Sequence, residues 1–447
     1  MPSKEHSPRL LQPTCVEYAL FFPLQKIQKA VSLHTVEQLK NGELVGIQRL
    51  QLSEQLTELP QEILTLADTL EILDVSNNLL SELPNWLTEL TQLKIVFASN
   101  NRFTRLPLIL GRCEKLEMVG FKSNQIVRVA EDSLPEQLRW LILTDNQIAK
   151  LPESLGYRPR LQKLALAGNK LTSLPNSFDQ LLNLELVRLS ANQLECFPSV
   201  LLELPKLAWV AFAGNPFCER TGLEESVPQV ASSAYKLNHV LGQGASGVIS
   251  HADWLDSDFD FPANVAVKVF KGDVTSDGYP CDELQACLQT GHHNNLVKSI
   301  AQVKEDNHLA LVMELIPDSY FNLGLPPTLQ TCTRDVFKQD FTLSVSQIEK
   351  IVDQMMDVFN HLHDNKVCHG DLYAHNVLIN DMGEMIFGDF GAASVYGYLT
   401  EAQQYGIRKV EARALGHFID DLLSVCKPIE KQTATYKSLC NLAQIIS

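Results

Sequence analysis

The first half of the chain repeats one order of apolar and polar positions at nearly constant spacing. From Leu70 the pattern LxxLxLxxNxLxxLP returns at steps of 22 or 23 residues. The steps are clearest in the asparagines, which are Asn78, Asn101, Asn124, Asn146, Asn169, Asn192 and Asn215. A single unit of this length cannot bury its own leucines, so successive units must stack around a common apolar core. The pattern predicts a solenoid with one short strand in each coil.

This spacing is typical of leucine-rich repeats, in which the asparagine has a structural task. Its side-chain amide can satisfy backbone groups of the tight loop that follows each strand. A shorter copy without the asparagine covers residues 47–60, and the polar start at 35–39 predicts a short capped helix before it. We expect an α/β leucine-rich-repeat solenoid with caps over residues 34–218, preceded by a poorly specified extension at 1–33.

The residues between the inward leucines should face the concave side of the solenoid, because side chains alternate along a strand. They form two rows. One row is Ile72, Ile95, Met118, Trp140, Lys163, Leu186 and Trp209, and the other is Asp74, Phe97, Gly120, Ile142, Ala165, Arg188 and Ala211. The face is apolar around Phe97, Met118, Trp140 and Ile142, where a solvated surface would be polar. We expect these four residues to bind a protein substrate or partner, unless the second half or the extension folds over them.

The second half of the chain carries polar motifs on short elements of a different kind. After a linker at 219–234, the glycine-rich segment Leu241-Gly-Gln-Gly-Ala-Ser-Gly-Val-Ile249 is followed by the buried strand Asn264-Val-Ala-Val-Lys268. A dinucleotide-binding fold would need a helix directly after the glycines. A strand with a single lysine instead favours the glycine loop and third strand of a protein kinase. Residues 235–447 should then form an α+β bilobal kinase-like domain, with a compact or truncated large lobe.

Five polar side chains appear in the order of the protein kinase motifs. Lys268 would contact the α- and β-phosphates of ATP, and Glu283 would hold the lysine in place. Asp371 can accept a hydroxyl proton, while Asn376 and Asp389 would ligate Mg²⁺. Each residue alone would be read as a turn, cap or surface residue, but their order makes the set specific. The expected ATP-binding residues are Leu241, Gly242, Gly244, Gly247, Ile249, Ala266, Lys268, Met313, Glu314, Ile316 and Leu378.

With these motifs in place, residues 34–447 resemble bacterial leucine-rich-repeat protein kinases, in which a solenoid is joined to a Ser/Thr-type kinase domain. The resemblance implies ATP- and Mg²⁺-dependent protein phosphorylation, on serine or threonine and including autophosphorylation. It assigns Asp371, Lys268 and Glu283 to catalysis and Asn376 and Asp389 to the metal. The repeats would then recruit the substrate or a partner.

The chain departs from the pattern of this family at four places. Gly370 stands where kinases usually have an arginine that receives a phosphorylated activation loop, so we expect control without such phosphorylation. Tyr373 stands where Ser/Thr kinases place a lysine on the γ-phosphate, so the positive charge of that lysine is missing here. The Ala-Pro-Glu motif is missing after Asp389-Phe-Gly, and Glu411 replaces the usual aspartate of the central helix. The sequence stops at Ser447, where the last helices of a kinase lobe would lie.

Two other functions stay open. His369-Gly-Asp371 followed by Asn376 also resembles aminoglycoside phosphotransferases, although the Asp-Phe-Gly motif, the Val-Ala-Val-Lys strand and the solenoid argue against a small-molecule kinase. A pseudokinase scaffold that acts through its repeats is favoured by the missing activation-segment motif. The presence of all five polar residues argues against it.

Composition limits the partners and the cellular location that we expect for the protein. The formal net charge is −16 without a visible basic patch, so nucleic acid is not an expected partner. Ten cysteines without a CxxC pair favour a reducing, cytoplasmic location over a disulfide framework. The apolar run at 18–24 is too short for a bilayer, which takes about 20 residues to cross. We therefore expect a cytoplasmic protein with no membrane segment.

Overall fold

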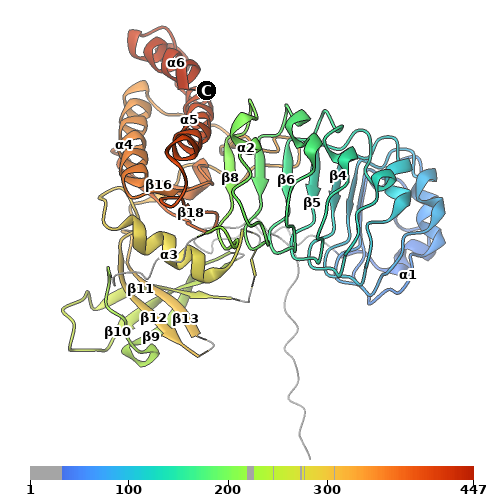
Figure 1. The fold of residues 1–447 in the computed structure, drawn as a ribbon, viewed down its shortest axis with the longest axis horizontal. Coiled ribbons are helices and arrows are strands. Elements are labelled where there is room, and N and C mark those ends of the chain that lie inside the picture. Colours follow the sequence, from blue (N-terminus) through green and yellow to red (C-terminus); the bar gives the residue numbers. More distant parts are fainter. Residues whose placement is uncertain are drawn as a thin grey trace, which may run out of the picture.

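The computed structural model describes residues 33–218, 226–244, 246–271, 274–275, 277–306 and 308–446. The expected extension, apart from Leu33, and the first part of the expected linker lie outside these residues. Figure 1 shows a curved solenoid, coloured blue to green, beside a domain of two lobes, coloured green to red. A parallel sheet of short strands is followed by an antiparallel sheet and helices, which confirms the expected fold class.

The solenoid is built on an eight-stranded parallel sheet with one strand from each coil, in chain order. The strands are β1 (Arg49–Gln51), β2 (Ile72–Asp74), β3 (Ile95–Phe97), β4 (Met118–Gly120), β5 (Trp140–Ile142), β6 (Lys163–Ala165), β7 (Leu186–Arg188) and β8 (Trp209–Ala211). Equivalent repeat positions pair with one another, so each position forms a row along the sheet. One short strand per coil is what the repeat pattern predicts.

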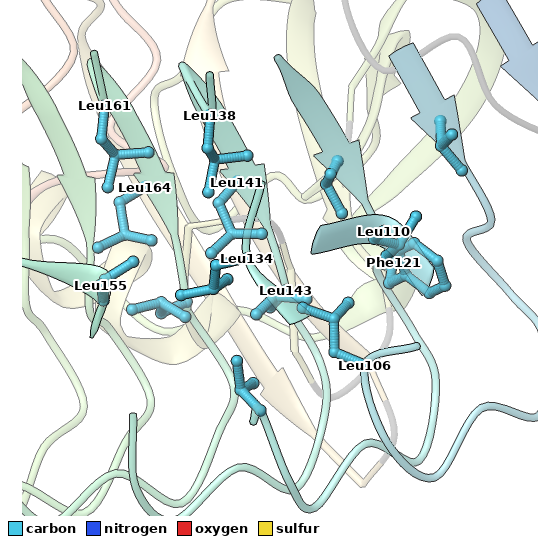
Figure 2. Packing of buried hydrophobic residues seen from close by; sticks show 14 of the residues in the cluster. Leu106, Leu110, Phe121, Leu134, Leu138, Leu141, Leu143, Leu155, Leu161 and Leu164 are labelled. Atoms are coloured by element: carbon cyan, nitrogen blue, oxygen red, sulfur yellow. The ribbon is translucent and has the colours of Figure 1, made fainter. Parts of the chain in front are cut away.

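Each coil returns through a short helical turn. These turns are η1 (Gln61–Leu66), η2 (Asn85–Glu89), η3 (Leu108–Arg112), η4 (Glu131–Ser133), η5 (Glu153–Leu155), η6 (Asn176–Gln180) and α2 (Val200–Glu203). Before the first coil lies the expected short capped helix, α1 (Val36–Lys40), where Thr35 and Gln38 form a capping box. The inward leucines of strands and turns pack into one column, part of which is seen in Figure 2.

The repeat asparagines tie the backbones of adjacent coils together. Asn146 accepts a hydrogen bond from the Ile126 amide at 2.9 Å, and it donates to the carbonyls of Phe121 and Leu143 at 2.9 and 3.0 Å. The other six asparagines make the same three kinds of bond, and all seven are buried. Their predicted structural role is confirmed.

The small lobe of the second half is a five-stranded antiparallel sheet with one helix. The sheet order is β12-β13-β11-β10-β9. Its elements are η7 (Ser232–Ala234), β9 (Tyr235–Gln243), β10 (Gly247–Trp254), β11 (Asn264–Phe270), α3 (Pro280–Thr290), β12 (Ser299–Glu305) and β13 (His308–Glu314). The predicted lysine strand is therefore β11, in the middle of the sheet, and α3 lies between this sheet and the other lobe in Figure 1.

The large lobe consists mainly of helices. Its elements are β14 (Phe321–Asn322), α4 (Val345–Asp364), β15 (Val367–Cys368), η8 (Ala374–Asn376), β16 (Val377–Ile379), β17 (Met385–Phe387), β18 (Ser394–Val395), α5 (Glu401–Ser424), η9 (Pro428–Glu430) and α6 (Ala434–Ile446). The predicted central helix around Glu411 is α5, and α6 packs against it. Across the described residues, no helix is both long enough and apolar enough to cross a membrane.

The solenoid and the large lobe share their apolar cores. The cluster inside the solenoid continues into Tyr396, Ile407 and Val410 of the large lobe. Conversely, Leu186 and Trp209 of the solenoid belong to the apolar cluster of the large lobe. Figure 1 shows β8 next to α5 at this junction. Because apolar side chains of both halves are buried together, the two halves form one packed unit.

The apolar patch on the concave face is covered by the chain itself. Met118 and Trp140 are only 2% and 3% exposed, in a cluster with Cys332, and Leu329 packs against the same cluster. The expectation that this patch, with Phe97 and Ile142 at its edge, is an open docking surface is wrong. Instead, the second half of the chain folds over the patch, and one of its loops buries these apolar side chains.

We expect Asn146→Ala to lower the free energy of unfolding by about 1–3 kcal/mol, because it leaves buried backbone groups unpaired. Asn85→Ala is the matched control, since Asn85 is exposed at the start of η2. Its effect should stay within about 0.5 kcal/mol. Urea unfolding midpoints of both variants check this, and equal midpoints would contradict the role assigned to the repeat asparagines.

Candidate active site

A buried ion pair joins the small-lobe sheet to its helix. Lys268 on β11 forms a salt bridge with Glu283 on α3, and both side chains are almost fully buried. Burial alone would lower the pKa of the Lys268 ammonium, but the carboxylates of Glu283 and Asp389 outweigh it and raise this pKa. The lysine is therefore charged, and its charge is held at a fixed place on the inner side of the small lobe.

Asp389 lies beside this ion pair. A Cβ atom built on Gly391 would be 3.3 Å from Asp389 Oδ1 and 3.9 Å from Glu283 Oε2. The Gly391 amide donates a hydrogen bond to Asp389 Oδ1 at 3.2 Å. Asp389 has a φ of +60°, which is uncommon for a residue other than glycine and is often found at functional sites. The structure therefore brings the Asp-Phe-Gly segment to the lysine that lies more than a hundred residues earlier in the chain.

Residues 369–376, called the catalytic loop after the role expected of Asp371, are held in place by α5. Glu411 Oε1 accepts a hydrogen bond from the His369 amide at 2.7 Å, and its Oε2 contacts His363 Nε2 at 2.9 Å. The His369 ring stacks on Phe387 with centroids 4.1 Å apart. Burial lowers the pKa of His369 to about 4. At neutral pH this ring is an uncharged packing element, and Glu411 orients the backbone that leads to Asp371.

Asn376 faces Asp371 from the end of η8. Its Nδ2 donates to the Asp371 Oδ2 atom at 2.9 Å and to the Asp371 carbonyl at 3.0 Å. Its Oδ1 is buried with no hydrogen-bond partner. An unpaired amide oxygen next to carboxylates suits Mg²⁺, which takes oxygen ligands and needs only one or two protein groups when phosphates supply the rest. Asn376 and Asp389 thus fit the metal that the sequence predicts.

Arg188, the last residue of β7, extends from the solenoid to Asp371. It forms a salt bridge with Asp371, a second one with Asp277 at 2.7 Å, and a hydrogen bond to the Gly370 carbonyl at 3.0 Å. Burial would lower the pKa of this guanidinium, but Asp371 and Asp277 raise it, so the arginine is charged. Burial raises the pKa of Asp371, and Arg188 opposes that rise.

Sequence reasoning placed Arg188 in a concave row but gave it no role. The available signal was a lone arginine in a row whose neighbours Ala165 and Ala211 are small and apolar. Nothing in the spacing of the kinase motifs points to a residue almost two hundred positions before Asp371. Its contribution depends on how the two halves pack, which no local pattern contains.

Contacts with the solenoid also explain two residues at which the catalytic loop departs from the kinase pattern, Gly370 and Tyr373. Gly370 has a φ of +71°, and a Cβ atom there would lie 2.4 Å from the Val210 carbonyl oxygen. Only glycine lets the last strand of the solenoid approach so closely. Tyr373 stacks on Trp209 with centroids 5.0 Å apart, and the Trp209 indole donates to the Leu372 carbonyl at 3.0 Å. Both residues therefore serve the junction of the two halves.

The structure brings together part of the expected ATP-binding set. Ile249, Ala266 and Met313 share one apolar cluster on the inner side of the sheet, and Leu241 packs against it. Gly242 pairs with Ile249, and Gly244 and Gly247 are joined by a backbone hydrogen bond of 2.9 Å. The remaining three residues are not members of this cluster: Glu314 ends β13 with its side chain on Lys298, Ile316 follows β13, and Leu378 lies on β16 of the large lobe.

Comparisons with known proteins match each half of the chain to a known domain. The protein kinase domain matches residues 235–409, and leucine-rich repeats match residues 69–90 and 136–194. Fibroblast growth factor receptor 1 of Xenopus laevis is 26% identical over 174 residues, which are 37% of this chain and 21% of the receptor. Serine/threonine-protein kinase PrkC of Bacillus subtilis is 25% identical over 232 residues, 47% of this chain and 33% of that kinase.

Among solved structures, a leucine-rich-repeat protein of Leptospira interrogans is 28% identical, with a TM-score of 0.34, over 40% of this chain and 52% of its own. The chain spans less than half of the length of the curated relatives named above. The family matches and the fold agree on the order of the two parts. A leucine-rich-repeat region is followed by a protein kinase domain.

We expect His369 to destabilise the protein in acid. Its pKa is about 4 in the folded state and about 6.5 for an unperturbed histidine of the unfolded chain, so the unfolded state binds more protons between these limits. Stability should therefore fall as the pH drops from 6.5 towards 4, by up to about 1.4 kcal/mol per pH unit for this group. The free energy of unfolding of wild type and His369→Gln, measured across this range, should show a shallower slope for the variant. Parallel slopes would contradict a neutral, buried His369.

Proposed function

We propose that this chain transfers the γ-phosphoryl group of ATP to serine or threonine hydroxyls of proteins, its own included. The proposal is carried by one observation: Lys268, Glu283 and Asp389 meet in one place, next to a catalytic loop that holds Asp371 and Asn376. Phosphoryl transfer needs positioning and charge neutralisation more than covalent help, and these five groups supply both.

The residues divide the reaction between them. Lys268, oriented by Glu283, would hold the α- and β-phosphates of the nucleotide. Asp371 would accept the proton of the acceptor hydroxyl as its oxygen forms a bond to the γ-phosphorus. The bond between this phosphorus and the oxygen bridging to the β-phosphate breaks, and ADP leaves. Asn376 and Asp389 would hold Mg²⁺, which when bound neutralises charge on the phosphates.

The wider setting is also part of the proposal. The leucine-rich repeats would recruit the substrate or a partner through surfaces other than the covered patch around Trp140. A cytoplasmic location is supported by the nine cysteines in the described part of the chain, all of which are free thiols. A bacterial source rests on the resemblance of the motifs alone, since the matched kinases come from Xenopus laevis as well as Bacillus subtilis.

The purified full chain should incorporate label from γ-labelled ATP into a protein acceptor. Lys268→Met and Asp371→Asn should each abolish incorporation, because they remove the phosphate-binding charge and the base. Lys298→Met is the matched control, since Lys298 is a half-exposed lysine directly before β12 whose side chain pairs with Glu314, and it should keep wild-type activity. Label in all four proteins alike would reveal a contaminating kinase, and none in wild type would favour a pseudokinase scaffold. Transfer to aminoglycosides in place of protein would favour the small-molecule alternative.

Removal of divalent metal should stop this transfer, and added Mg²⁺ should restore it. Asp389→Asn should require a higher Mg²⁺ concentration for half-maximal rate, because one ligand loses its charge. Asp381→Asn, in the turn before β17, is a control that should keep the wild-type Mg²⁺ dependence. Titrations of the initial rate against Mg²⁺ measure both. An unchanged titration for Asp389→Asn would exclude Asp389 as a metal ligand.

A further inference from the structure

The catalytic centre of this chain is completed by a residue from outside the kinase domain. All three nitrogens of the Arg188 guanidinium are engaged there, on Asp371, Asp277 and the Gly370 carbonyl. The arginine is only 4% exposed. The catalytic loop itself has glycine and tyrosine, at positions 370 and 373, where the resembling kinases carry basic residues. Arg188 of the solenoid therefore supplies a positive charge next to a catalytic loop that has no basic residue at positions 370 and 373.

The junction that carries Arg188 has the character of a permanent interface. Trp209 is sandwiched between Tyr373 and His417, with centroids 5.0 and 5.4 Å away. Ser394 accepts hydrogen bonds from the Phe212 and Ala213 amides at 3.0 and 3.1 Å. The apolar cores are also continuous across the junction. Separating the halves would expose a shared core, so the arginine stays in the centre through the reaction.

The arginine leaves the base able to act. An ionised carboxylate has about four lone-pair sites on its two oxygens. Arg188 takes a site on Oδ1 of Asp371, and Asn376 takes a site on Oδ2. The Asp371 side chain is still 21% exposed. By the lone-pair count, each oxygen has one more site that a hydroxyl could use. The planar guanidinium of Arg188 spreads its donors over Asp371, Asp277 and the Gly370 carbonyl at once, whereas a lysine acts as a point charge.

We propose that Arg188 is a positioning residue of the phosphoryl-transfer centre: the solenoid supplies the guanidinium that orients the Asp371 carboxylate towards the acceptor hydroxyl. This inference rests on the proposed function. It makes the leucine-rich repeats a structural part of the enzyme, in addition to any partner that they hold. The opposite role, an inhibitory clamp that must open, would require the shared core of the two halves to separate.

The test compares steady-state kinetics of wild type, Arg188→Met and Arg188→Lys in the full chain. Arg188→Met should lower kcat about 100-fold, because a misplaced base loses the attack geometry. The KM for ATP should stay within about twofold, since the nucleotide is held by other groups. Arg188→Lys should recover part of kcat, because it restores the charge without the planar fork. A purely structural role would not produce this split between kcat and KM or the partial rescue.

Two further variants keep the test decisive. Arg139→Met is the matched control, because Arg139 also reaches from the solenoid to the kinase domain but binds the carbonyls of Leu329 and Gln330; it should keep wild-type kcat. If Arg188→Met does not fold, Asp277→Asn weakens the hold on Arg188 at a site that is 28% exposed, and should lower kcat about tenfold. Unchanged or raised activity in the variants that fold, or an equal loss in Arg139→Met, overturns the inference. A wild type without activity overturns the proposed function and this inference together.

Discussion

The buried charge of Arg188 constrains the whole molecule. An arginine this deeply placed must be matched by carboxylates, and removing one partner of a buried ion pair costs about 3–5 kcal/mol. Its partners Asp371 and Asp277 come from the large and small lobes, while the arginine comes from the solenoid. One side chain thus ties three parts of the chain together. The orientation of the solenoid, the catalytic loop and the loop before α3 cannot change independently.

Local patterns were enough to predict the fold class and the elements that carry the motifs. The repeat asparagines reveal the coils in the sequence. Each makes the same three hydrogen bonds to the backbone, so the same residue recurs at this position from coil to coil. The five polar residues could be found because the motifs of protein kinases follow one order along the chain; they are Lys268, Glu283, Asp371, Asn376 and Asp389. The structure places them around one centre, and their individual roles stay predictions.

The contacts between the halves could not be predicted, because they depend on shape and not on sequence period. Trp140 in a strand gives the same signal whether a partner protein or Cys332 of the same chain covers it. In the same way, Gly370 and Tyr373 looked like losses when judged against a kinase domain alone. Beside Val210 and Trp209 they are the residues that the junction requires, one for lack of a side chain and one for its flat ring.

Because the strands of the solenoid pair in register, each coil has a fixed position relative to the large lobe. The contacts to the catalytic loop come from β7 and β8. Trp140 on β5 contacts Cys332 in a different loop of the large lobe. The large lobe therefore sets the spacing between these coils. A coil duplicated before β1 would lengthen the solenoid and leave this spacing intact. A coil gained or lost between β5 and β7 would carry Arg188 out of phase with Trp140. A duplicated coil at the β1 end would therefore leave the junction of the two halves unchanged, whereas one between β5 and β7 would disrupt it.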